Sequence, residues 1–160
     1  GDVGNRYLFQ ALARNGLNEM MYRMHNHSEV PGYGFQLQFG ATTLTELWDP
    51  RKGASWNHFM MGQIVEWFYK SLAGISTDNE HNDHGFQTVV IAPQVVGDLK
   101  SVSASHETLY GNITVDWHIK DDQFMMEVSV PFNCQAKIYL PGEEGYEVVK
   151  SGSYSFRRKQ

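Results

Sequence analysis

Apolar residues in the first part of the chain recur every three to four positions, which is the period of an amphipathic helix. Two such sets follow one another, and between them Asn15-Gly16 provides a left-handed helix stop. The first set is Tyr7, Leu8, Ala11 and Leu12, and the second is Leu17, Met20, Met21 and Met24. The pattern therefore predicts a short helical hairpin of the kind that builds α/α bundles and toroids.

A third helix is predicted over residues 57–73, with Gly74 just beyond its end. Its apolar face consists of Met60, Ile64, Trp67, Phe68 and Leu72. The segment before it is rich in Pro and Gly, so we expect a long irregular loop with a short strand over residues 35–39. Long loops inside compact domains are often functional.

The second half of the chain changes to a period of two, which is typical of strands with one buried face. Alternating runs cover residues 102–108, 113–119, 124–130, 136–140 and 148–156, punctuated at Asp121-Asp122, Pro141-Gly142 and Ser151-Gly152. They indicate an antiparallel β-sandwich. We therefore expect an α+β chain with a helical domain over 1–76, a polar linker over 77–85 and a β domain over 86–160.

Composition narrows the classes of function. The chain has 160 residues, 41% of them hydrophobic, which is enough for a core. A net charge of −5 argues against nucleic acid as a partner, and no apolar run approaches the roughly 20 residues of a membrane span. The single cysteine, Cys134, excludes an internal disulfide and is expected to be buried. The chain begins at Gly1 and enters a helical pattern at once, so we expect further sequence upstream, and the cellular compartment is left open.

One carboxylate stands out in the long loop. Glu46 lies in the segment GATTLTELWD, residues 40–49, beside Trp48. Hydrolysis of a glycosidic bond generally needs two carboxyl groups, and aromatic rings suit the apolar faces of a sugar. His58 follows twelve residues later and has hydrogen-bonding groups suited to a sugar hydroxyl. Plainer interpretations exist, because a loop Glu is usually solvated, Trp usually lies in the core and Asn57 is a common helix cap.

At these residues the sequence resembles the bacterial α-L-rhamnosidase family. The resemblance is carried by three blocks in the family's usual order, which together cover most of residues 1–75. They are GDVGNRY at 1–7; PGYG at 31–34 with GATTLTELW at 40–48; and NHFM at 57–60 with EWFY at 66–69 and LAGI at 72–75. The β half has weaker motifs but is compatible with the family's carboxyl-terminal sandwich.

The resemblance implies that the helices are the last ones of an (α/α)6 toroid and that the enzyme inverts configuration. It implies that Glu46, in the pattern Thr-x-x-x-Glu-x-Trp, is the general base, and that His58 contacts rhamnose. Asn57, Trp48 and Tyr33 are the further candidates for substrate binding, and no cofactor or metal is implied. The partner is then a rhamnosyl-containing carbohydrate.

Two departures from the family pattern concern this site. Many members have Trp where this chain has Thr45, and many have a longer segment between the glutamate and the Asn-His pair. The general acid in the family lies in an earlier loop, so we expect the missing amino-terminal part of the polypeptide to supply it and this piece alone to be inactive.

Other patterns are given less weight. His81 and His84 lie close together in the polar linker but lack further ligands at a recognised metal-site spacing. Two alternatives to a rhamnosidase stay open: a different (α/α)6 glycosidase or lyase, in which Glu46 has another role, and a non-catalytic carbohydrate-binding β-sandwich module.

Overall fold

The structure is a computed structural model that describes residues 2–78 and 85–159. It divides into two compact units, Gly1–Trp67 and Phe68–Gln160. Along the sequence, the division between the units falls within the third predicted helix, whereas the domain boundary expected at residue 77 stays a prediction. No helix of the described residues is long and apolar enough to cross a membrane.

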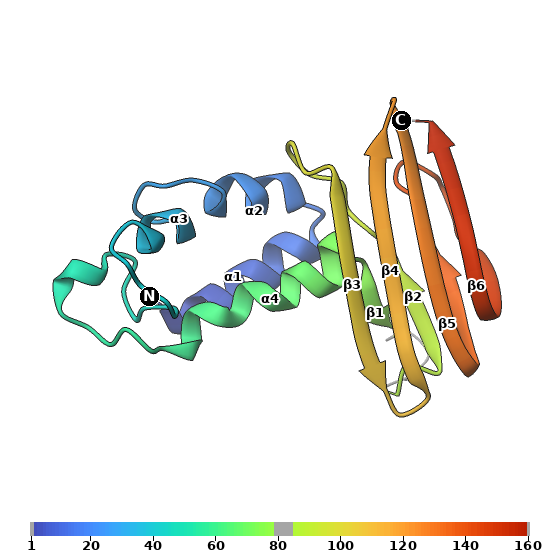
Figure 1. The fold of residues 1–160 in the computed structure, drawn as a ribbon, viewed down its shortest axis with the longest axis horizontal. Helices are drawn as coiled ribbons and strands as arrows, with labels where there is room; N and C mark the ends of the chain where they lie inside the picture. Colours follow the sequence, from blue (N-terminus) through green and yellow to red (C-terminus); the bar gives the residue numbers. More distant parts are fainter. Residues whose placement is uncertain (1, 79–84, 160) are drawn as a thin grey trace. The chain divides into compact units, whose positions relative to one another are not determined.

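The first unit is helical and irregular. Its elements are α1 (Asp2–Arg14), α2 (Asn18–His25), α3 (Tyr33–Leu37), the 3-10 turns η1 (Pro50–Lys52) and η2 (Phe59–Gln63), and α4 (Ile64–Trp67). The first two predicted helices are confirmed, and Figure 1 shows them as consecutive coils joined by a tight turn. Gly16 at φ +71° ends α1, and the amides of Gly16 and Leu17 donate to the carbonyls of Ala13 (3.1 Å) and Leu12 (2.9 Å). This pair of bonds is the Schellman motif, as the Asn-Gly signal predicts.

The third predicted helix is present, but it changes type along its length. The chain winds as a 3-10 helix in η2, as an α-helix in α4 and as a wider π-helix in η3 (Phe68–Leu72). The amide of Ala73 accordingly donates to Phe68 five residues back, at 2.9 Å. A spacing of three and four residues fits all these windings, so the apolar pattern did not distinguish them.

The expected strand over residues 35–39 is wrong, because α3 occupies Tyr33–Leu37. Gly32 has extended backbone angles (φ −172°, ψ 148°), and its carbonyl accepts a hydrogen bond from the amide of Phe35 at 3.2 Å. The helix therefore starts directly after Gly32. Alternation over five residues is too short to separate a strand from one helical turn.

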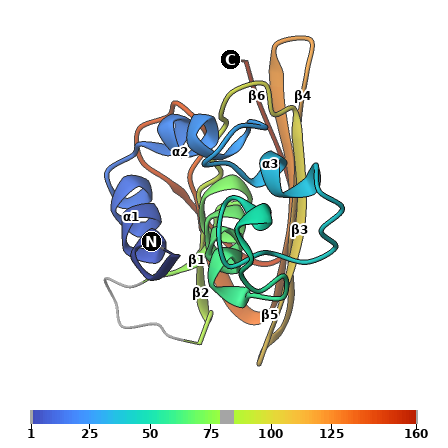
Figure 2. The same cartoon turned by 90° about the vertical axis from the view of Figure 1, so that its left-hand side faces the viewer.

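The second unit contains a six-stranded sheet. Its strands are β1 (Ile75–Thr77), β2 (Thr88–Ile91), β3 (Ser101–Thr108), β4 (Gly111–Lys120), β5 (Gln123–Ile138) and β6 (Glu147–Lys159). The order is β1-β2-β5-β4-β3, with β6 also paired to β5. Figure 1 shows β3, β4, β5 and β6 side by side, and Figure 2 shows the strands from a direction 90° away. The Asp121-Asp122 hairpin turn is confirmed, with φ of 51° and 57°.

The expected antiparallel sandwich needs two corrections. One pair of strands, β2 with β5, is parallel, and all the ladders join in a single sheet instead of two. The reason lies in β5, which pairs with β4 before a bulge at residues 130–135 and with β2 after it. β6 follows β5 past the bulge, so Gly152 lies inside a strand and not in the turn that the Ser151-Gly152 pattern suggested. Local alternation does not reveal which strands a long strand pairs with.

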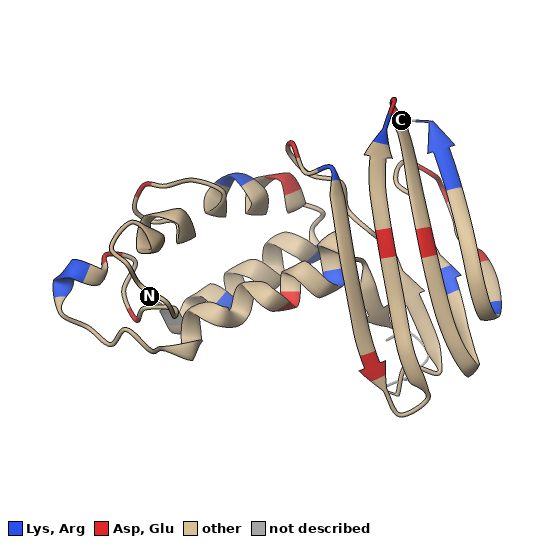
Figure 3. Cartoon of the chain, in the orientation of Figure 1, with Lys and Arg blue, Asp and Glu red and all other residues tan. Residues whose placement is uncertain are grey.

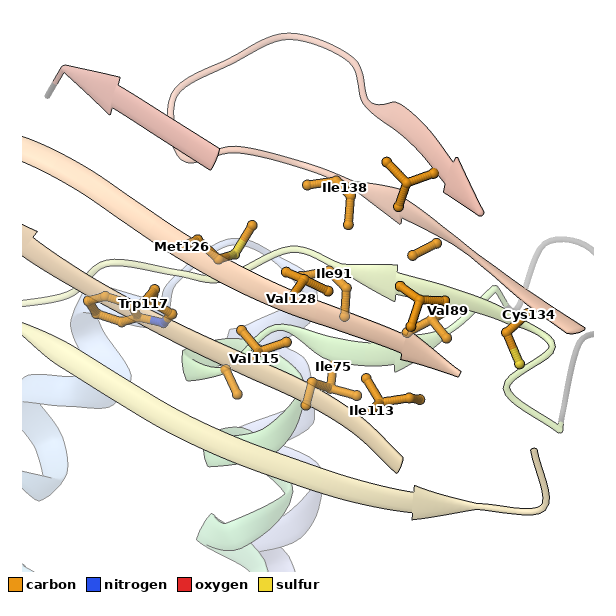
Figure 4. Close-up of a cluster of buried hydrophobic side chains, with 14 of the residues drawn as sticks. Ile75, Val89, Ile91, Ile113, Val115, Trp117, Met126, Val128, Cys134 and Ile138 are labelled. Atoms are coloured by element: carbon orange, nitrogen blue, oxygen red, sulfur yellow. The ribbon is translucent and has the colours of Figure 1, made fainter. Parts of the chain in front are cut away.

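Both parts of the sheet contribute to one core. Figure 4 shows Val115 and Trp117 of β4 with Met126 and Val128 of β5, and residues of β1 and β2 in the same cluster. These side chains are almost fully buried, and the indole N–H of Trp117 donates to the carbonyl of Leu72 at 2.8 Å. Cys134 is buried, as expected. The unit therefore has one apolar interior, as a sandwich would, although its strand pairs form a single connected sheet.

Candidate active site

The loop that carries Glu46 folds back on the start of the third helix. The amide of Glu46 donates to the carbonyl of Ser55, and the amide of His58 donates to the carbonyl of Leu44, both at 2.9 Å. The hydroxyl of Thr43 also donates to the carbonyl of Trp56. These cross-links place two sequence-predicted residues, Glu46 and His58, on adjoining segments of one loop.

The carboxylate of Glu46 is held by the backbone. Its Oε2 accepts a hydrogen bond from the amide of Ser55 at 3.2 Å, and the side chain is half-buried. One oxygen of the carboxylate is thus held by a backbone donor, which fixes the orientation of the side chain. A carboxylate oriented in this way suits the acceptance of a proton from a bound water.

Thr45, where the sequence departs from the family pattern, lies on the inner side of this loop. Its side chain is 1% exposed, and its hydroxyl donates to the carbonyl of Leu47 at 2.7 Å. Its amide donates to the side-chain carbonyl of the buried Gln36 at 3.3 Å. Thr45 therefore anchors the loop from within, and the adjacent Glu46 lies on the more accessible side.

An ion pair fixes the outer turn of the loop. Asp49 caps η1, and its carboxylate binds Arg51 through hydrogen bonds of 2.8 and 2.9 Å. The hydrogen bond from Arg51 lowers the pKa of Asp49. The guanidinium of Arg51 also lies over the ring of Phe39, 4.9 Å from its centroid. The carboxylate of Asp49 is thus engaged in holding the loop.

Two further predicted residues, Tyr33 and Trp48, meet in an aromatic cluster. Their rings are 5.0 Å apart and nearly perpendicular, and the Tyr33 hydroxyl donates to the carbonyl of Met61 at 2.5 Å. Burial raises the pKa of Tyr33, so its phenol stays protonated as that bond requires. The cluster continues through His25, 5.5 Å from Tyr33 and 6.4 Å from Trp48, to Phe9.

Sequence reasoning missed His25 as a member of this group. Its Nδ1 lies 2.7 Å from the carbonyl of Met21, which only accepts, so Nδ1 carries the proton and Nε2 is the acceptor in the neutral ring. Desolvation by burial lowers the pKa of His25. The only advance signal was its place four residues after Met21, on the inner face of the second predicted helix.

The remaining candidates have more exposed positions. Asn57 is exposed, and its amide donates to the hydroxyl of Ser55 at 3.2 Å. The His58 ring is half-buried and stacks on the ring of Phe59 at 6.0 Å. Among the described residues no three His, Cys, Asp or Glu side chains form a metal-binding group. The His81 and His84 pair lies outside the described residues.

Comparison with known proteins gives these features a context. Residues 1–72 match the model of the bacterial alpha-L-rhamnosidase 6 hairpin glycosidase domain, and residues 74–155 match that of the bacterial alpha-L-rhamnosidase C-terminal domain. An alpha-L-rhamnosidase of Formosa agariphila is 32% identical over 98% of the chain, and one of Streptomyces avermitilis is 30% identical over 89%. The chain spans only 17% and 14% of the lengths of these two relatives.

Solved structures agree with the sequence matches. An alpha-L-rhamnosidase from Dictyoglumus thermophilum superimposes with a TM-score of 0.89 at 30% identity, covering all of this chain and 21% of that one. The Streptomyces avermitilis alpha-L-rhamnosidase complexed with L-rhamnose gives a TM-score of 0.86 at 28% identity, over 99% of this chain and 18% of that one. The chain has a helical unit followed by a mixed sheet, and models of one family match both parts. The chain therefore belongs to the bacterial α-L-rhamnosidase family.

Proposed function

We propose that the protein is an inverting glycoside hydrolase that releases terminal α-L-rhamnose, and that Glu46 is its general base. The observation that carries this proposal is the backbone-held Glu46 carboxylate on a loop shared with His58, in a chain of the rhamnosidase family. The helices of the first unit then belong to the end of an (α/α)6 toroid. The domain limits expected from the sequence, 1–76 and 86–160, are part of the same proposal.

The chemistry follows from what inversion requires. Glu46 removes a proton from a water on the face of the sugar opposite the leaving group, while a second carboxylic acid protonates the glycosidic oxygen. The Ser55 amide holds Oε2 of Glu46 and leaves Oε1 to take the proton. We propose that the acid comes from a part of the enzyme outside these 160 residues, so residues 1–160 alone are expected to be inactive.

The other candidates have roles in substrate binding. Tyr33 and Trp48 offer ring surface for the apolar C–H face of a sugar, and the His58 imidazole offers a hydrogen-bonding group for a hydroxyl. Asn57 is a further polar contact next to His58. Thr45 supports the base from the interior through its bonds to Leu47 and Gln36.

Substitution of the base is the direct test. We expect Glu46→Gln in the intact enzyme to lower kcat on an aryl α-L-rhamnoside by about 10²-fold or more, because the amide no longer accepts the proton of water. Glu29→Gln, an exposed loop carboxylate of the same unit, is the matched control and should leave kcat unchanged. Proton NMR of the first product should show β-L-rhamnose.

The result also separates the alternatives. Turnover of other aryl glycosides without any cleavage of α-L-rhamnosides would assign the fold to a different glycosidase. Unchanged kcat in Glu46→Gln would remove the base assignment, and release of α-L-rhamnose would refute inversion.

A further inference from the structure

The second unit contains a cleft that the proposed hydrolysis does not use. Its floor is the row Ser76, Val90 and Lys137, which the register of β1, β2 and β5 places side by side. Their strand neighbours Val89 and Ile91 are fully buried, so the row faces away from the core. The segments 92–95 and 139–143 stand as walls and complete a cleft of about 600 Å³. This volume is typical of small-molecule sites.

Both walls are held in place by hydrogen bonds. The amide of Gln94 donates to the carbonyl of Ser71, and the amide of Tyr139 donates to the carbonyl of Ile91, each at 2.8 Å. Arg158 braces the tip of the second wall, because it donates to the carbonyl of Gly142 at 2.8 Å and pairs with a carboxylate of the same turn at 3.0 Å. The cleft is therefore formed before any ligand arrives, which reduces the entropy lost on binding.

The charges in the cleft compensate one another. Lys137 Nζ lies 2.7 Å from Asp78 Oδ2, and its other side faces the ring of Tyr146 at 5.1 Å. The side chains of Lys137 and Asp78 are only 14% and 6% exposed. The remaining lining carboxylate, Glu143, pairs with Arg158. A negatively charged ligand would therefore find no uncompensated cation among these groups.

The rest of the lining mixes hydroxyl, amide and apolar groups. Ser76 and Gln94 provide polar groups, and Pro93 and the ring of Tyr139 provide apolar surface. A sugar has the matching chemistry, with hydroxyls around its edge and C–H groups on its faces. We propose that this cleft is a second carbohydrate site, which binds a neutral saccharide unit. The proposal does not rest on the role of Glu46, because every lining residue lies within 76–143.

Hydrogen exchange of the intact protein with free sugars tests the proposal. With millimolar L-rhamnose or D-galactose, we expect amides of segments 92–95 and 139–143 to exchange at least twofold more slowly, and with D-glucuronate to stay unchanged. Protection of residues 44–58 by L-rhamnose reports separately on the proposed active site. The two sites can thus fail independently.

Matched variants locate the binding. Ser76→Phe fills the floor and should abolish protection of the two walls, whereas Ser103→Phe, on the exposed face of edge strand β3, should keep it. Ser76→Ala removes the floor hydroxyl at nearly constant size and should weaken binding at least threefold if Ser76→Phe does not fold. No protection by either neutral sugar, equal protection by D-glucuronate, or protection that survives both Ser76→Phe and Ser76→Ala overturns the proposal.

Discussion

Gly74 offers the sharpest test of how the second unit is built. It follows η3 and has φ +80°, a left-handed conformation that disfavours any side chain by about 1–2 kcal/mol. A Cβ at this position would also lie 2.3 Å from the backbone nitrogen of Pro93 and 2.4 Å from the backbone carbon of Ala92. Backbone atoms have no rotamer through which to move away, so the segment after β2 must shift.

The shift has a calculable consequence. It would strain the 3.0 Å bond from the Ala92 amide to the Gly74 carbonyl, a loss of about 1 kcal/mol. Overpacking adds about 1–3 kcal/mol. Together with the cost of about 1–2 kcal/mol for the left-handed backbone, Gly74→Ala should lower the free energy of unfolding of the second unit by about 3–6 kcal/mol.

A control within the same unit separates the two effects. Gly145 has φ +86°, but a Cβ there would meet nothing within 4 Å. Gly145→Ala should therefore show only the backbone term, about 1–2 kcal/mol. Native-state hydrogen exchange of the β2 and β5 amides in the intact protein measures both changes. Equal destabilisation by the two variants would refute the close approach of Gly74 to the segment after β2.

Three more predictions concern side chains. Burial lowers the pKa of His25, so as pH falls from 7 to 5 the imidazole takes up a proton in the unfolded chain before it does so in the folded one. The free energy of unfolding of the first unit should therefore be at its full value above about pH 6.5 and decline below it. In urea titrations, His25→Gln should flatten this decline. Asn18→Leu removes the acceptor at 2.8 Å from the buried Trp67 indole and should destabilise the first unit by about 1–3 kcal/mol in urea, with partial recovery in the double variant that adds Trp67→Phe. Asp116 and Glu127 are like charges directly opposite on β4 and β5 (Figure 3), so Glu127→Lys should raise the free energy of unfolding by about 0.2–1 kcal/mol in urea, and 1 M salt should shrink the gain.

The candidate site was only partly predictable. Glu46, Trp48 and His58 were found from a loop pattern and a family resemblance, both of which are properties of short segments. The backbone bonds that bring 44–46 onto 55–58, and the aromatic contact of His25 with Trp48, join residues nine or more positions apart. Nothing in the local sequence specifies such pairs, because they depend on how the loop closes. The role of Thr45 as a buried anchor was hidden for the same reason.

What the chain determined by itself was local: helices where apolar residues recur every three to four positions, the Gly16 stop, the strands around the Asp121-Asp122 turn, and the buried Cys134. A helix or hairpin forms between neighbours, so its pattern is written in consecutive residues. Tertiary structure alone decided the parallel pairing of β2 with β5, the bulge that lets β5 serve two partners, and the wider winding of η3. These features depend on packing between distant segments, where strand register and helix winding adjust to the core that they share.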